Sequence, residues 1–354
     1  MAAAHVAPDP SNLMRVAITG LGKAVPTRVV TNAEIAPQVG VSTDWIETRS
    51  GILERRYAGP EESTSSLGTT AAVQALTVAQ LDPENLSMVI CATCTPDFLL
   101  PGTASIIQDN IGAARAGAFD LNAACSGFVY ALSIGASLIG TGAATSVLII
   151  GADLLSRHLD FTDAMTAPLF GDAAAAVVLE ADENAEPIQF EMGSDGSGLQ
   201  QVLVPGGGSK LPADGNRFDP SCLNIKMQGR EVFRNAVRVM SELGARFGKD
   251  GFELMVAHQA NRRILDECAV QIGVDREKVY QNIERYGNTS AASIPLALCD
   301  AWAEGKLTPG DRLLMVAFGA GYAWGAAKLN WTLPTPQEVF PKRAPATSLE
   351  PTPA

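Results

Sequence analysis

The residues most suited to chemistry lie in three short segments that are far apart in the chain. The first spans residues 120–127 (DLNAACSG) and places Cys125 after an apolar strand-like run, at the start of a helical pattern. Unpaired backbone N–H groups and the helix dipole at such a position favour the thiolate, the nucleophilic form of cysteine. Small neighbours allow a sharp turn, so the N–H of Cys125 can point at an oxyanion. The pattern indicates covalent catalysis by Cys125; the alternative is a small cysteine that fills space in the core.

The other two segments supply hydrogen-bond donors. In residues 256–263 (VAHQANRR) a strand delivers His258 to a strand–helix junction, where its ring can donate to an oxyanion or exchange a proton. Residues 286–293 (YGNTSAAS) form a glycine–asparagine turn before a helix, and the amide of Asn288 can donate to the same oxyanion. The simpler alternatives are a buried, satisfied histidine and an ordinary helix cap, since asparagine, threonine and serine all serve as N-caps.

The remaining cysteines and histidines offer no comparable second site. The chain has six cysteines and three histidines, and neither His5 nor His158 lies in a motif. Cys91 and Cys94 form a CxxC, which could be redox-active or half of a zinc site, but no second CxxC or nearby histidine completes a metal set. We therefore expect no metal site and reduced thiols throughout.

Composition excludes several classes of function. The formal net charge of the 354 residues is −12, which argues against a basic surface for nucleic acid. No apolar run reaches the roughly 18 residues that a membrane-spanning helix needs. Residues 1–13 have no basic start and no apolar core of a signal peptide, so we expect a cytoplasmic protein that does not bind membranes.

Apolar strand-like runs alternate with helical patterns along the chain. This alternation predicts an α/β protein whose central mixed sheets are layered with helices. The order of elements repeats, which predicts two duplicated halves at 14–185, with the cysteine, and 186–332, with the histidine and asparagine. Residues 1–13 are expected to be a disordered lead-in and residues 333–354 a proline-rich tail. The predicted strands are 16–20, 87–92, 118–122, 146–152, 174–179, 190–194, 254–257, 312–318 and 324–331, and the predicted helices are 65–79, 101–111, 125–139, 227–247, 261–272 and 291–304.

Together these segments resemble β-ketoacyl-acyl carrier protein synthase III, a condensing-enzyme family of the thiolase fold that initiates bacterial fatty acid synthesis. The similarity runs from about residue 16 to 331 and includes HQAN, GNTSAAS, residues 44–52 (DWIETRSGI), 170–172 (FGD) and 318–325 (FGAGYAWG). The resemblance implies a thiolase-like fold, a homodimer and no bound cofactor, with acyl-CoA as a substrate.

The resemblance also implies a decarboxylative condensation with Cys125, His258 and Asn288 as catalytic residues. Cys125 would take an acyl group from acyl-CoA and hold it as a thioester. Malonyl-acyl carrier protein would then lose carbon dioxide, and His258 and Asn288 would stabilise the enolate that attacks the acyl group. The N–H groups of Cys125 and of an oxyanion loop would stabilise the oxyanion. That loop comprises Gly319, Ala320 and Gly321.

Further residues match family positions that bind substrate. Arg230, Arg234 and Arg238 recur every four residues, a basic stripe that suits CoA phosphates or the acidic face of a carrier protein; the alternative is a solvated helix face with carboxylate partners. The residues expected to bind CoA or the carrier are Trp45, Arg49, Gly229, Arg230, Arg234, Asn261 and Arg263, and those expected at the acyl pocket are Leu100 (from a partner subunit), Phe170, Met227 and Phe318.

Some positions depart from the family pattern. The family usually has an arginine where Ala164 stands, and Ala320 replaces a glycine, which suggests a specialised relative that loads starter units in a secondary-metabolite pathway. Elongating synthases need a second histidine, and only His158 is spare; thiolases need a second cysteine, which residues 318–325 lack. Plant-type polyketide synthases share the three catalytic types, but their local motifs fit less well. A non-catalytic carrier-protein-binding subunit would lack Cys125.

Overall fold

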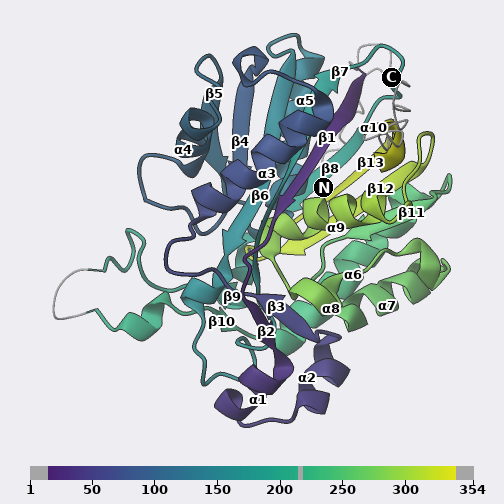
Figure 1. Cartoon of the computed structure of the whole chain (residues 1–354). Coiled ribbons are helices and arrows are strands. Elements are labelled where there is room, and N and C mark those ends of the chain that lie inside the picture. The colour runs from purple at the N-terminus through teal and green to yellow at the C-terminus, as the bar shows by residue number, and fades with distance from the viewer. Residues whose placement is uncertain (1–14, 214–217, 340–354) are drawn as a thin grey trace, which may run out of the picture.

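The computed structural model describes residues 15–213 and 218–339, and its core is two mixed β-sheets (Figure 1). In the first sheet β4 runs parallel to β5 and β6, while β7 runs antiparallel to β6 and β1. In the second sheet only the β11–β12 pair is parallel. The first has the order β1 (Val16–Ala24), β7 (Asp172–Ala181), β6 (Ser146–Leu154), β4 (Met88–Ala92), β5 (Gly117–Leu121); the second has β11 (Leu254–Ala257), β12 (Arg312–Gly319), β13 (Ala323–Asn330), β8 (Gln189–Ser194).

Helices and sheets alternate in layers, as predicted. The helices α3 (Thr64–Ala79) and α4 (Thr103–Asn110) cover one face of the first sheet. The helices α5 (Gly127–Gly140) and α9 (Ser293–Ala303) lie between the two sheets and pack on both. The helices α6 (Gly229–Gly248) and α7 (Arg262–Ile272) cover the far face of the second sheet (Figure 1). No helix of residues 15–213 and 218–339 is both long and apolar enough to span a membrane.

Strand β1 continues past its predicted end at Gly20 because its glycines serve packing. A Cβ at Gly20 would lie 2.1 Å from the carbonyl oxygen of Ala75, and one at Gly22 would lie 2.1 Å from that of Ala71. Both alanines are on α3 and fully buried. Glycine therefore allows the helix backbone to approach the strand, which continues to pair with β7 as far as Ala24.

Several short elements were not predicted from the sequence. Their patterns are short and polar: α2 contains the run TDWIETRS and begins after Ser42, whose side chain accepts the N–H of Trp45. Met227 was predicted to begin the long helix, but it pairs in a two-stranded ribbon and α6 starts at Gly229. The additional elements are α1 (Asn32–Val39), α2 (Thr43–Ser50), α8 (Ile283–Tyr286), α10 (Pro336–Val339), and the pairs β2 (Val29–Thr31) with β3 (Glu54–Arg56) and β9 (Val202–Leu203) with β10 (Lys226–Met227).

The two predicted terminal segments lie largely outside the described residues. The lead-in at 1–13 and the tail from residue 340 onward are among them. The first part of the predicted tail, residues 333–339, packs on the body of the protein: Leu333 is buried, and the indole N–H of Trp302 donates to the carbonyl of Pro334 at 2.7 Å.

Candidate active site

Cys125 lies in the turn that connects β5 to α5. A 3-10 turn spans Ala124–Ser126, and Ala124 has a φ of +47°, a left-handed conformation that an alanine rarely adopts. The end of β12 packs directly on this turn, because a Cβ at Gly319 would lie 2.8 Å from the backbone nitrogen of Cys125. Cys125 is half-buried, and its backbone lies against the end of β12.

The Cys125 thiol is neutral at rest, which corrects the expectation of a favoured thiolate. Burial raises its pKa from 9.0 to about 12, although the nearby Ser290 hydroxyl lowers it. A helix dipole contributes at most about 2 kcal/mol, or roughly 1.5 pKa units. Desolvation therefore outweighs the dipole, and the thiol must lose its proton as it attacks.

His258 follows β11 directly, and its ring is held by Ser293. The Nδ1 atom lies 2.6 Å from Ser293 Oγ, which also accepts the backbone N–H of Gln259 at 3.4 Å. The serine oxygen is thus occupied as an acceptor and its hydroxyl proton can be donated to Nδ1, which leaves the ring proton on Nε2. Burial lowers the pKa of His258 to about 3. The side chain is therefore a neutral donor rather than a cation at physiological pH.

Asn288 is oriented by its own turn. Its side-chain oxygen accepts the N–H of Ser290 at 2.9 Å, so its Nδ2 remains available as a donor. Its backbone N–H donates to Leu169 O at 2.8 Å, and its carbonyl accepts the N–H of Gly171 at 3.0 Å. The preceding Gly287 has a φ of +66°, and a Cβ there would lie 2.8 Å from Leu169 O. Glycine at 287 is therefore required for this close docking.

The segment 288–293 brings the three side chains together. Its Ser290 lies beside the Cys125 thiol, and its Ser293 binds the His258 ring. Strand β12 makes the same connection from the other sheet, because Val316 O accepts the backbone N–H of His258 at 2.9 Å and Gly319 abuts Cys125. One sulfur, one imidazole and one carboxamide are thus held by shared elements.

A pocket of about 350 Å³ lies beside this centre. Its walls include Leu169, whose carbonyl binds Asn288, and Ala164 stands where the resemblance led us to expect an arginine. The Arg49 guanidinium covers the Trp45 ring at 4.6 Å. Of the seven residues predicted to bind CoA or the carrier, all but Arg234 line the pocket: Trp45, Arg49, Gly229, Arg230, Asn261 and Arg263.

Known proteins match this chain over nearly its whole length. The family model 3-oxoacyl-[acyl-carrier-protein] synthase III matches residues 119–196, and the model of its C-terminal part matches residues 245–331. The β-ketoacyl-[acyl-carrier-protein] synthase III of Roseiflexus sp. (strain RS-1) is 46% identical over 323 residues, which is 89% of this chain and 98% of that relative. The chain belongs to the β-ketoacyl-[acyl-carrier-protein] synthase III family.

Two solved structures are similar to this chain, one a synthase III and the other a related priming ketosynthase. The synthase III of Aquifex aeolicus VF5 is 41% identical, with a TM-score of 0.82, over 89% of this chain and all of that one. The priming β-ketosynthase of the R1128 polyketide pathway is 33% identical, with a TM-score of 0.83, over 94% of this chain and all of that one. Membership of the synthase III family confirms the expected thiolase-like fold and the expected enzyme class, a condensing acyltransferase.

The four residues predicted at the acyl pocket do not line the 350 Å³ pocket. Phe170 is buried and bridges to Asn288, whereas Phe318 is buried with its ring 4.8 Å from that of Tyr322. Met227 is half-buried and its methyl group lies near Gly229. Leu100 is 83% exposed and lies in a loop with the exposed Phe98 and Leu99, so it does not reach the pocket of its own chain.

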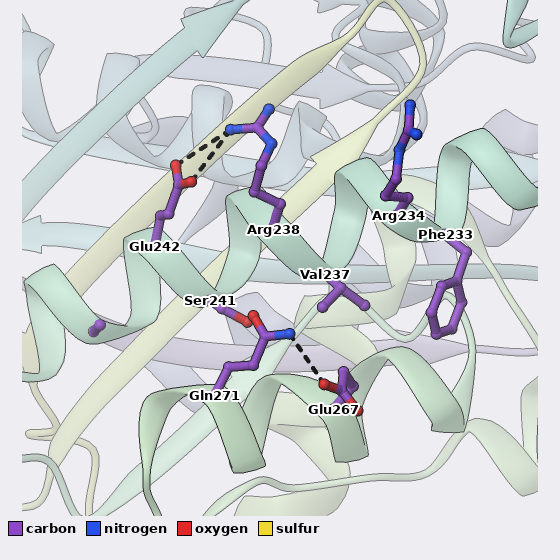
Figure 2. A pocket seen from close by; sticks show the side chains of 9 residues that line it. Phe233, Arg234, Val237, Arg238, Ser241, Glu242, Glu267 and Gln271 are labelled. Carbon is purple, nitrogen blue, oxygen red and sulfur yellow. Dashed lines mark hydrogen bonds and ion pairs between the residues drawn. The ribbon is translucent and has the colours of Figure 1, made fainter.

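The basic stripe on α6 is divided between two cavities. Arg230 lines the pocket beside the catalytic centre, whereas Arg234 and Arg238 border a groove of about 610 Å³ between α6 and α7 (Figure 2). Arg238 pairs with Glu242 at 3.3 Å, and Arg234 pairs with Glu231. The carboxylate partners of the alternative interpretation are thus present.

The other candidates serve structure in this synthase. Cys91 is fully buried in β4, and the Cys94 thiol donates to Asp153 Oδ1 at 3.3 Å. The His158 Nδ1 lies 2.8 Å from the carbonyl of Leu223. Among residues 15–213 and 218–339 no three histidine, cysteine or acidic side chains form a metal-binding group. Ser293, which contacts the His258 ring, was not singled out from the sequence; it is the first residue of α9 and so resembled an ordinary capping serine.

The close contact at Gly319 predicts a large effect of one methyl group. We expect Gly319→Ala to slow acylation of Cys125 at least about tenfold, because the new Cβ meets backbone atoms that cannot move aside without displacing the nucleophile. Burst kinetics with acyl-CoA measure this rate. Gly196→Ala is the matched control, since a Cβ there would meet nothing within 4 Å, and it should acylate normally.

The neutral state of His258 predicts a pH dependence of stability. The ordinary pKa is 6.5 and the folded value is about 3, so the unfolded chain binds the proton first as the pH falls. The contribution is fully present above pH 6.5 and is lost toward pH 3, at about 1.4 kcal/mol per pH unit. Urea unfolding at pH 7 and pH 5 should therefore show a drop in stability about 2 kcal/mol larger for the wild type than for His258→Asn. Equal drops would show that His258 titrates normally.

Proposed function

We propose that this enzyme initiates fatty acid synthesis by condensing an acyl-CoA starter with malonyl-acyl carrier protein in the cytoplasm. The observation that carries this proposal is the segment 288–293, which touches both Cys125 and His258 and carries Asn288 itself. An enzyme with a covalent thioester and two neutral donors facing it is equipped for acyl transfer followed by enolate attack.

In the first half-reaction Cys125 accepts the acyl group. The Cys125 sulfur attacks the thioester carbonyl, its carbon–sulfur bond to CoA breaks, and the proton lost by Cys125 is taken up by the departing CoA, which leaves as a thiol. The oxyanion of this step is stabilised by the N–H of Cys125 and by the loop of Gly319, Ala320 and Gly321, whose first residue abuts the cysteine backbone. Each such donor stabilises the transition state by about 3 kcal/mol.

In the second half-reaction His258 and Asn288 act on the malonyl thioester. Its carboxylate leaves as carbon dioxide, and the electron pair of the broken bond becomes an enolate. The His258 Nε2–H and the Asn288 Nδ2–H donate to the enolate oxygen. The enolate carbon attacks the acyl carbonyl and releases the Cys125 thiolate, which takes up a proton from solvent to restore the resting thiol. A histidine with a pKa of about 3 suits this task, because it stabilises the anion without protonating it. Loss of carbon dioxide drives the reaction, so no step requires a metal or bound cofactor.

The 350 Å³ pocket takes the thioester arm of both substrates. Its three guanidinium groups, from Arg49, Arg230 and Arg263, match the phosphates at the outer end of CoA, and Trp45 offers an aromatic surface. In this proposal Gly229 and Asn261 line the thioester arm of the substrate. Phe170, Met227 and Phe318 border its acyl chain. Ala164 contributes no charge, so the arginines carry the phosphate recognition.

The groove between α6 and α7 docks the carrier protein. We expect the charge reversal Arg234→Glu/Arg238→Glu to raise the KM for malonyl-acyl carrier protein about tenfold and leave the KM for malonyl-CoA unchanged, because only the carrier's acidic face reaches this groove. Steady-state kinetics with both acceptors measure the difference. Arg246→Glu is the matched control on the same helix, since Arg246 pairs with Glu191 outside the groove. Equal changes with both acceptors would contradict docking here.

The exposed loop of Phe98, Leu99 and Leu100 forms part of a homodimer interface. The side chains are 59%, 88% and 83% exposed, a run of apolar surface that a partner subunit would cover. In this arrangement Leu100 completes the acyl pocket of the partner. Analytical ultracentrifugation tests the dimer.

A specialised starter-unit ketosynthase is the second candidate. Ala164 and the 33% identity with a priming polyketide ketosynthase favour it, whereas the 41–46% identity with synthases III of several bacteria favours the first. Intact-mass screening with acyl-CoAs of different length, followed by malonyl-acyl carrier protein, distinguishes the two. Acetyl- or short branched acyl-CoA giving a β-ketoacyl-carrier product supports initiation of fatty acid synthesis; loading of unusual starters alone supports the second candidate.

A further inference from the structure

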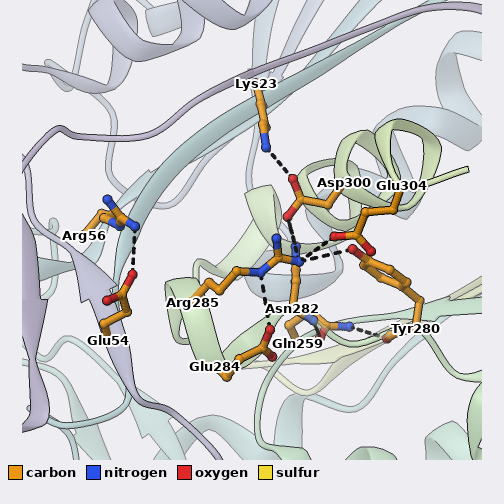
Figure 3. A network of polar contacts seen from close by, with 10 residues as sticks. All are labelled: Lys23, Glu54, Arg56, Gln259, Tyr280, Asn282, Glu284, Arg285, Asp300 and Glu304. Carbon is orange, nitrogen blue, oxygen red and sulfur yellow. Dashed lines mark hydrogen bonds and ion pairs between the residues drawn. The ribbon is translucent and has the colours of Figure 1, made fainter. Parts of the chain in front are cut away.

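A polar network with a buried centre connects β1, the start of α8 and α9 (Figure 3). Its centre is Asp300 on α9, which is 2% exposed. One carboxylate oxygen accepts from Lys23 of β1; the other accepts Asn282 Nδ2 at 2.9 Å and lies 3.3 Å from Arg285 Nη2. None of these residues belongs to a motif from which the catalytic roles were proposed.

The network continues from Asn282 to the residue beside the catalytic histidine. The backbone N–H of Asn282 donates to Gln259 Oε1 at 3.1 Å. The amide nitrogen of Gln259 donates to Ala257 O at 2.7 Å and to Tyr280 O at 3.2 Å. The Gln259 side chain is therefore fixed at both ends, and a buried amide fixed in this way holds its own backbone in place.

The same carboxylate ties together three segments that carry active-site groups. Gln259 follows His258 at the end of β11, α8 leads from Asn282 to the turn of Asn288, and α9 begins at Ser293, which binds the His258 ring. Asp300 lies two helical turns after Ser293 on α9 and so faces the same side. Movement of this one side chain would disturb both proposed oxyanion donors and the serine that sets the histidine tautomer.

Charge balance favours a fixed network. Arg285 also reaches Glu304 Oε1 and the Tyr280 hydroxyl, both at 3.2 Å, so one of the two cationic partners of the buried carboxylate is itself held by further contacts. Removing one partner of a buried, hydrogen-bonded set leaves the others unsatisfied and lets them move.

We propose that Asn282 and Asp300 are positioning residues for the condensation half-reaction: through Gln259, α8 and α9 they hold the His258 and Asn288 donors at the enolate site. This rests on the proposed roles of His258 and Asn288. Cys125 is carried by the turn between β5 and α5, and among the described residues this network makes no hydrogen bond to either element, so we expect acylation to depend on it much less than decarboxylation does. A displacement of about 1 Å at a reacting centre can reduce a rate about 100-fold.

The test compares the two half-reactions in the full-length enzyme. In Asn282→Ala we expect kcat for decarboxylation of malonyl-acyl carrier protein to fall 10- to 100-fold, with KM and the rate of Cys125 acylation changed less than threefold. Asp300→Asn keeps the shape of the carboxylate and removes its charge; it should give the same separation, and it decides the question if Asn282→Ala does not fold.

The control is Lys23→Met, which removes another partner of Asp300 but leaves the side-chain hydrogen bond between Asn282 and Asp300 intact. It should lower the unfolding midpoint without changing the ratio of the two half-reaction rates. Equal losses in acylation and decarboxylation, or no loss in either, in a folded Asn282→Ala or Asp300→Asn would overturn the proposal. His258→Ala is measured alongside: if it also spares decarboxylation, the assigned role of His258 fails, whereas loss in His258→Ala alone refutes only the positioning role.

Discussion

Cys125→Ala is expected to show no acyl adduct by intact-protein mass spectrometry after incubation with acyl-CoA. The sulfur is the only group in the proposed centre that can form the thioester, since His258 is held as a neutral donor by burial and Ser293. Overall condensation should fall by about 10⁴-fold or more, as is typical when a catalytic nucleophile is deleted.

The matched control for this experiment is Cys222→Ala. Cys222 is also a half-buried free thiol, but it lies in the 3-10 turn Pro220–Leu223, away from the β5–α5 turn. It should acquire the acyl mass as the wild type does. An adduct of normal yield in Cys125→Ala would place the nucleophile elsewhere.

His258→Ala and Asn288→Ala should separate the two half-reactions. Both variants are expected to form the acyl-enzyme within a few-fold of the wild-type rate, because in the proposed mechanism the oxyanion of acylation is stabilised by backbone N–H groups of Cys125 and of the loop that begins at Gly319. Decarboxylation of malonyl-acyl carrier protein should fall about 10²- to 10³-fold in each, the usual effect of deleting one oxyanion donor. Release of labelled carbon dioxide measures this step directly.

A control for these two variants comes from the same turn. Thr289 is buried beside Asn288, and its hydroxyl is not used in the proposed mechanism. Thr289→Val should therefore decarboxylate malonyl thioesters at close to the wild-type rate. Loss of acylation with intact decarboxylation in His258→Ala or Asn288→Ala would reverse the assigned roles.

The layered fold could be predicted because its strands are apolar throughout and its long helices are periodic. The run Ser146–Leu154 is buried at every position, as its sequence indicates. The helices α1 and α2 were missed because each is only eight residues long, one contains Pro37 and the other is mostly polar. They are defined by caps and by docking on the rest of the chain, which no local pattern shows.

The three segments proposed to be catalytic could be singled out from the sequence, but the pKa values of their side chains could not be predicted from it. The position of Cys125 before a helix suggested a lowered pKa, yet desolvation, a property of the folded environment, raises it. The neutral state of His258 and its pairing with Ser293 likewise depend on which residues surround the ring. The Asn282–Asp300 network could not be predicted from the sequence, because its residues come from four separate elements that meet only in the folded chain.

The central claim is that the Cys125 sulfur accepts the acyl group and then transfers it to a carbon atom derived from malonyl-acyl carrier protein. The direct test starts from wild-type enzyme that has been incubated with acyl-CoA and divided into two samples. One sample is digested for peptide mapping, and malonyl-acyl carrier protein is added to the other. The acyl mass should map to the peptide that contains Cys125 and should disappear from the second sample as β-ketoacyl-carrier protein forms. An acyl group on another residue, or one that malonyl-acyl carrier protein cannot discharge, would contradict the mechanism.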